Sequence, residues 1–171
     1  MRMLLAQLQQ ELRQLQSQID AIDVGIVQAS VEQEACQGLM AIPGIGPVTA
    51  TAIVSAIGNG ADFKKGRGFS AWLGLIPGQP STGGKQRLLG ISKRGNSYLR
   101  KLLVNGARVV LQSREKQSSG LRTWLGKLVS RAHSSVVTVA LANKLARMAW
   151  AVVAKGETYR PPLLAAEAVA A

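Results

Sequence analysis

The chain has almost none of the residues that build disulfides and zinc sites. Its 171 residues include one cysteine, Cys36, and one histidine, His133. An intrachain disulfide needs two cysteines and a structural zinc site needs four ligands, so both are excluded. A single cysteine is also typical of a reducing cytoplasm. We expect Cys36 to be a small buried residue and His133 to be a helix-end residue without an acid–base role.

Long hydrophobic runs are missing as well. The longest mainly apolar run, residues 136–142, is ended by Asn143 and Lys144. It is far shorter than the roughly 20 residues that a membrane span needs. The N-terminus also lacks the charged start, apolar core and cleavage site of a signal peptide. We therefore expect a soluble intracellular protein with no membrane partner.

Acidic residues are scarce, and they are unevenly placed. Nine Asp or Glu residues face 21 Lys or Arg residues, which gives a net charge of +12, while 47% hydrophobic residues provide enough material for a core. Residues 1–36 hold two basic and five acidic residues, a net −3, whereas residues 63–160 hold 19 basic and two acidic residues, a net +17. Such asymmetry predicts that the basic part binds nucleic acid and that the acidic part has another role. A basic surface without a polyanionic partner is the alternative.

The acidic segment carries a heptad pattern. Its apolar residues alternate in spacings of three and four, which is the signature of a coiled coil. They are Leu5, Leu8, Leu12, Leu15, Ile19, Ile22, Ile26 and Ala29. The pattern predicts a helix over residues 1–36 that forms a homo-oligomer, and an amphipathic helix folded back on its own domain is the alternative.

A Pro-Gly turn follows in residues 39–53. Pro43 and Gly44 break one helix, and Pro47 suits the first turn of the next. The pattern resembles a helix-hairpin-helix, in which the amides near Gly44 and Gly46 would bind a nucleic-acid phosphate without reading sequence. A plain interhelix turn would use the same residues.

Helical periodicity dominates the rest of the chain. It predicts helices over residues 96–112, 121–132 and 134–155, with Asn96 as an N-cap and a C-cap near Gly156. No useful stretch alternates with period two. The sequence therefore predicts an all-α fold: a coiled-coil helix, a compact domain over residues 37–160, and a loosely ordered tail over residues 161–171. We expect the three tryptophans, Trp72, Trp124 and Trp150, to pack in the core.

A glycine-rich stretch holds the strongest chemical signal. Residues 74–85 read Gly-Leu-Ile-Pro-Gly-Gln-Pro-Ser-Thr-Gly-Gly-Lys, and residues 90–96 read Gly-Ile-Ser-Lys-Arg-Gly-Asn. No acid lies between residues 63 and 114. Serine needs an activating environment to act as a nucleophile, and backbone amides with cations suit a phosphate. Taken alone, a Ser-Thr-Gly-Gly string is also a common turn.

These motifs, within residues 39 to about 160, resemble the C-terminal transposase domain of the insertion-sequence one-ten family. These are DEDD-type DNA recombinases guided by a bridge RNA and related to the Piv invertase. The resemblance implies that Ser81 is the nucleophile and forms a phosphoserine link to DNA, although Thr82 departs from a Ser-Ser form of the motif. It also implies DNA and guide RNA as partners, in the nucleoid-associated cytoplasm of a bacterium or archaeon.

Basic and glycine residues around these motifs are the expected nucleic-acid contacts. They are Gly44, Gly46, Lys64, Lys65, Arg67, Thr82, Gly83, Gly84, Lys85, Arg87, Lys93, Arg94, Asn96 and Arg100. Ser92 and Ser113 are hydroxyls in basic surroundings that we interpret as phosphate contacts or surface residues. Arg147 is interpreted as a packing residue or a phosphate contact.

The resemblance also implies a partner domain, because family members carry a RuvC-like domain whose DEDD carboxylates hold magnesium. Asp62 is the only acid between Glu34 and Glu115, so no such carboxylate cluster exists here and no metal or cofactor is expected in this chain. We expect Mg²⁺ to act only together with that domain, and the isolated chain to be inactive. A non-catalytic DNA- or RNA-binding module and a purely structural oligomerisation protein are the alternative functions.

Overall fold

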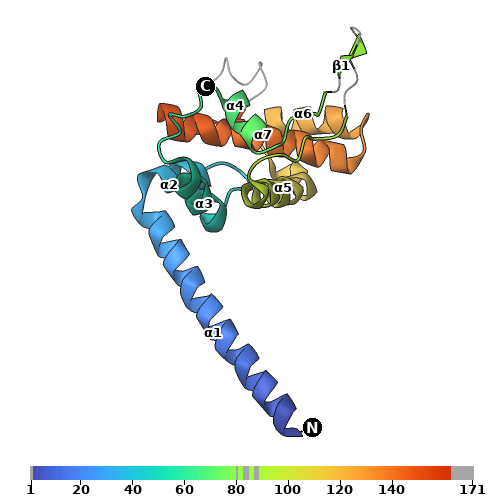
Figure 1. Ribbon diagram of the computed structural model, residues 1–171. Helices are drawn as coiled ribbons and strands as arrows, with labels where there is room; N and C mark the ends of the chain where they lie inside the picture. The colour runs from blue at the N-terminus through green and yellow to red at the C-terminus, as the bar shows by residue number, and fades with distance from the viewer. Residues whose placement is uncertain (1, 80, 83–84, 87–88, 163–171) are drawn as a thin grey trace.

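A computed structural model describes residues 2–79, 81–82, 85–86 and 89–162 (Figure 1). The elements are α1 (Arg2–Glu32), α2 (Glu34–Met40), α3 (Pro47–Ile57), α4 (Gly66–Trp72), β1 (Ser81–Thr82), β2 (Lys85–Gln86), α5 (Ser97–Gln112), the 3₁₀ turn η1 (Arg114–Lys116), α6 (Ser119–Val129) and α7 (Ser134–Lys155). The all-α prediction is confirmed in outline. Beside the helices, the two-residue strands β1 and β2 pair in antiparallel fashion.

Helix α7 is the centre of the core. It packs against α2, α4, α5 and α6, and a stripe spaced by four residues, which includes Val137, Leu141, Leu145 and Ala149, is fully buried. By length and composition alone α7 could cross a membrane. Its position explains that composition, since its apolar side chains fill the core of the domain.

Helix α1 runs away from this core as a long single helix (Figure 1). Only its C-terminal end is covered, where it packs against α2 and α3 and buries Ser30. The six stripe residues from Leu5 to Ile22 are 49–67% exposed. The alternative of a helix folded back on its own domain is therefore wrong for these residues.

The first helix ends earlier than the heptad pattern predicted. Gln33 has extended backbone angles (φ −96°, ψ 116°), and α2 starts at the next residue. Cys36 thus lies on α2, not on the stripe of α1. It is buried as expected, and this burial raises the pKa of its thiol. A buried, protonated thiol is a poor nucleophile.

The predicted ends of α5 and α7 are confirmed, whereas the helix predicted over residues 121–132 runs from Ser119 to Val129. The Asn96 side chain accepts a hydrogen bond from the Leu99 amide at 3.0 Å, and His133 Nδ1 accepts one from the Ser135 amide at 3.2 Å. Gly156 closes α7 with φ +63°. Helix α4 was not predicted, because its seven residues are too short for a clear helical period.

Asn96→Ala should lower the free energy of unfolding by about 1 kcal/mol, because the amide of Leu99 loses its acceptor. Asn96→Ser keeps a capping oxygen and should stay within a few tenths of a kcal/mol of the parent protein. Urea unfolding followed by circular dichroism measures both. Equal stability of the two variants would contradict the capping role.

Candidate nucleic-acid interface

Ser81 lies on the outer part of a two-stranded projection, which we call the serine arm (residues 74–93 where described). Strands β1 and β2 pair there, with Ser81 opposite Gln86 and Thr82 opposite Lys85. In Figure 1, β1 lies beyond the helical body, on the side away from the free end of α1. The motif predicted as a glycine-rich loop is thus a projecting hairpin.

The inner part of the serine arm is also paired across its two sides. Gly78 donates to the Gly90 carbonyl at 2.9 Å, and Leu89 donates to Gly78 at 2.9 Å. Closer to the helices, the amide of Ser92 donates to Ile76 at 2.8 Å. The last of these hydrogen bonds occupies the amide of Ser92, a residue that the sequence offered as a phosphate contact.

Two helices hold the base of the arm. The Arg100 guanidinium of α5 donates to the carbonyls of Leu73 at 2.9 Å and Arg94 at 3.3 Å, and Asn143 of α7 donates to Leu75 at 3.1 Å. Arg100 therefore stabilises the base of the serine arm through these hydrogen bonds. Its predicted contact with nucleic acid stays a prediction. Asn143 was missed, since nothing in the sequence pattern of α7 distinguishes an amide that reaches a loop 68 residues away.

At the base of the serine arm, the backbone at Gly95 lies so close to the end of α4 that only a glycine fits. Gly95 has φ +83°, and a Cβ at this position would overlap the carbonyl oxygen of Trp72. No other residue type fits there without moving the chain. The path of the arm out of the helical body is thus fixed by local sterics as well as by hydrogen bonds.

Predicted cations occupy both ends of α4. Lys93 and Arg94 are exposed at the base of the serine arm, beside a hollow of about 740 Å³. Lys64, Lys65 and Arg67 lie at the start of α4 and line a cleft with α7. A seven-residue helix is about 10 Å long, so the structure brings the two groups to neighbouring surfaces.

Part of the predicted site is described only in its backbone or not at all. For Ser81, Thr82 and Lys85 the structure gives strand positions. Gly83, Gly84 and Arg87 lie outside the described residues. Their predicted roles stay predictions.

The helix-hairpin-helix-like turn has one packed glycine and one open glycine. Gly44 has φ +83°, and a Cβ there would lie 2.7 Å from the Gly106 carbonyl oxygen of α5. Gly46 is exposed at the start of α3, with open space around it, and Pro47 follows as the first helical residue. Gly44 therefore has a packing role, while a phosphate contact fits the end of the turn near Gly46 and stays a prediction.

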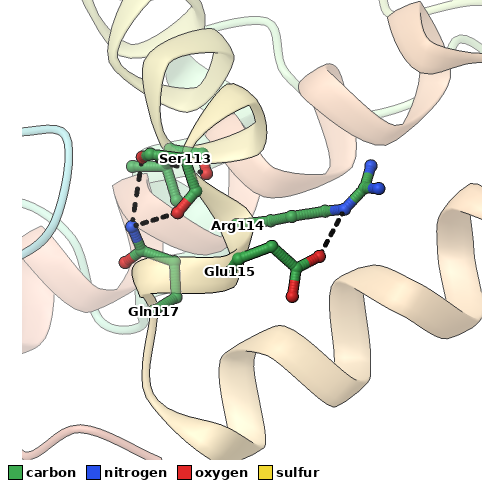
Figure 2. Close-up of polar contacts among 5 residues, drawn as sticks. Ser113, Arg114, Glu115 and Gln117 are labelled. Atoms are coloured by element: carbon green, nitrogen blue, oxygen red, sulfur yellow. Dashed lines mark hydrogen bonds and ion pairs between the residues drawn. The ribbon is translucent and has the colours of Figure 1, made fainter.

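The hydroxyl of Ser113 forms hydrogen bonds with neighbouring residues of the protein. It donates to the Val109 carbonyl at 2.9 Å, and the Gln117 amide donates to both the hydroxyl and the carbonyl of Ser113 at 3.3 Å (Figure 2). Arg114 pairs with its neighbour Glu115 at 3.2 Å. Ser113 closes the end of α5 and is not placed as a nucleophile.

The described residues do not suit a magnesium ion. Among them, no three His, Cys, Asp or Glu side chains come together as a potential ligand set. Divalent cations of this kind prefer several carboxylate or carbonyl oxygens, which the basic surface around the serine arm does not supply.

This arrangement defines a basic helical domain with a serine on a projecting arm. The chain belongs to the Transposase IS116/IS110/IS902 family, whose pattern matches residues 36–121. The matched region contains the turn at Gly44, all of α4 and the serine arm. The resemblance seen in the motifs is thus confirmed at the level of the family.

Individual relatives extend the match over most of the chain. The chain is 46% identical over 159 residues to a probable family 20 transposase of Pseudomonas aeruginosa, and 45% identical over 156 residues to the IS1328 transposase of Yersinia enterocolitica. These alignments cover 92% and 91% of this chain and 47% of each relative. The IS1111A transposase of Coxiella burnetii is 43% identical over 74% of this chain and 35% of its own length. The chain therefore spans about half the length of the first two relatives.

Proposed function

We propose that this chain is the nucleic-acid-binding, serine-bearing part of an insertion-sequence transposase. The observation that carries the proposal is the serine arm: Ser81 lies on a strand that projects from a surface rich in cations, within the region that matches the family. Lys93 and Arg94 at its base have no ion-pair partner among the described residues. Unpaired cations are available to neutralise phosphates.

Ser81 is the proposed nucleophile toward a DNA phosphodiester. Its Oγ forms a bond to phosphorus, the bond from phosphorus to the leaving strand's oxygen breaks, and the serine proton ends on that oxygen as a hydroxyl. The product is a phosphoserine diester, so the bond energy is conserved for rejoining. Lys85, Arg87, Lys93 and Arg94 would stabilise the charge of the transition state.

The catalytic step needs groups that the described residues do not contain. We assign Mg²⁺, the carboxylates that hold it and recognition of a guide RNA to a further, RuvC-like domain or to contacts with it. Self-association through α1 would bring more than one serine arm into the same assembly. We place the protein in the bacterial cytoplasm, at the nucleoid, because its proposed substrate is there.

A non-catalytic binding module is the second candidate. The exposed cations Lys93 and Arg94, which have no ion-pair partner among the described residues, would serve such a module equally well. Both candidates predict nucleic-acid binding, and they differ only in covalent chemistry.

The chain should bind duplex DNA with modest sequence preference and strong salt dependence. If about five phosphates are neutralised, the slope of log K against log salt concentration should be about −4 to −5. Fluorescence anisotropy with a labelled 20-base-pair duplex across KCl concentrations measures the slope. No binding at low salt, or a flat response, would contradict both candidates.

A further inference from the structure

A cleft separate from the serine arm lies between the start of α4 and the C-terminal half of α7. Its volume is about 680 Å³, and α4 packs against α7 beside it (Figure 1). We call it the α4–α7 cleft. Six of its lining residues are cations: Lys64, Lys65, Arg67, Lys144, Arg147 and Lys155.

The two walls of the α4–α7 cleft are held together closely. A Cβ on Gly66 would lie 3.1 Å from the Arg147 carbonyl oxygen and 3.2 Å from the Trp150 ring. The Trp150 indole also donates to the Gly60 carbonyl at 3.3 Å, which fixes the loop before α4 onto α7. The cations therefore sit on a preorganised scaffold, which lowers the entropy lost on binding.

The polar side chains of the cleft are all positively charged donors. The other lining residues are glycine, alanine, methionine and tryptophan, which offer no side-chain acceptor for a base edge. Trp150 is only 8% exposed, so its ring is not free to stack on a base. This chemistry fits anionic oxygens and does not fit readout of bases.

Acidic neighbours compensate little of this charge. Lys155 pairs with Glu157 at 3.2 Å, but both side chains are more than half exposed, and such pairs are weak. Asp62 is close in sequence to Lys64 but does not line the cleft. The other five cations have no ion-pair partner in the part of the chain that the structure describes.

The cations are spread along the cleft instead of converging on one point. Lys144 and Lys155 are eleven residues apart on α7, or about 16 Å at 1.5 Å per residue. Along the axis of a duplex, where each strand places one phosphate about every 3.4 Å, this length spans about five phosphates of one strand. An extended polyanion suits this spacing better than a single small anion does.

We infer that the α4–α7 cleft is a second nucleic-acid site, which binds the phosphodiester backbone of a strand without reading its sequence. The inference rests on the proposed function, because it specifies where this chain binds nucleic acid at a distance from Ser81. Arg147 is then a phosphate contact and not a packing residue. The site lies about one α4 length from the base of the serine arm, so a strand in the cleft would continue toward the arm.

The test is a triple variant, Lys64→Gln, Lys65→Gln and Arg147→Gln. All three side chains are exposed, and their removal leaves no partner unpaired. At about 0.1 M KCl the dissociation constant should rise about tenfold or more, and the salt slope should flatten by about 2 to 3. Anisotropy with a 20-base-pair DNA duplex and with an RNA hairpin distinguishes the two sources of the backbone.

A matched control removes the same charges elsewhere. Lys116→Gln, Arg122→Gln and Lys127→Gln lie on η1 and α6, are exposed and do not line the cleft. This variant should bind within about threefold of the parent protein. A third variant, Lys64→Arg, Lys65→Arg and Arg147→Lys, keeps every charge and should also bind within about threefold.

The outcomes separate the site from the proposed function. If the parent protein binds with steep salt dependence but the cleft variant behaves like the control, the cleft is not a site and the proposed function stands. If the parent protein does not bind either probe, the proposed function itself fails. Loss of binding in the charge-preserving variant would also overturn the inference, because phosphate attraction needs charge and not shape. A loss confined to one probe supports the site and identifies that nucleic acid as its ligand.

Discussion

Ser81→Ala should abolish a covalent protein–DNA adduct in a protein that joins this chain to a magnesium-binding DEDD domain. With DNA, Mg²⁺ and guide RNA present, the parent protein should accumulate an adduct that resists denaturation. DNA affinity of the variant should change by less than about threefold, because the hydroxyl acts in the transition state more than in ground-state binding. Denaturing gel electrophoresis of labelled DNA measures the adduct.

Neighbouring hydroxyls provide the controls for this result. Thr82→Ala and Ser92→Ala should both keep substantial adduct formation. If the adduct survives Ser81→Ala but disappears with Thr82→Ala or Ser92→Ala, the nucleophile is that residue and not Ser81. The isolated 171-residue chain should bind DNA and leave it intact with or without Mg²⁺, and efficient cleavage by it would overturn the division of the active site between two domains.

Leu12→Lys together with Ile19→Lys should convert an associated protein into a monomer. Both side chains are exposed in a single chain, at 67% and 51%, so the change costs little within the protomer. In a coiled-coil seam the same lysines would be buried without partners, at a cost of several kcal/mol. Sedimentation velocity at tens of micromolar protein measures the mass.

Gln10→Lys with Ser17→Lys is the matched control. Both positions are exposed on the same helix, and the heptad register places them on the side away from the seam. This control should keep the mass of the parent protein. A monomeric parent, or an unchanged mass in the Leu12 and Ile19 variant, would contradict self-association through α1.

Long helices and their ends could be predicted from the sequence. The α5 periodicity predicted one apolar face of Leu99, Leu102, Leu103, Ala107 and Val110; Leu102 is half-buried and the other four are buried. The Asn96 cap was also predictable, because capping depends on a few neighbouring residues. Helix periodicity and helix capping depend on residues that are close in sequence, so both can be predicted from one sequence.

The serine arm and the α4–α7 cleft could not be predicted in the same way. Pairing of β1 with β2 gives only two residue pairs, which is too short for an alternating pattern. Arg100 and Asn143 act through tertiary contacts, across 27 and 68 residues respectively. One signal was available and missed: Lys144, Arg147 and Lys155 share the solvent face of a helix whose other face is apolar.

The most direct test of the account is identification of the modified residue by mass spectrometry. The covalent adduct formed with the DEDD domain, Mg²⁺, guide RNA and DNA is digested with nuclease and protease, and the nucleotide-bearing peptide is fragmented. We expect a phosphodiester on the side-chain oxygen of Ser81. A nucleotide on Thr82, on Ser92 or on a residue outside the serine arm would contradict it.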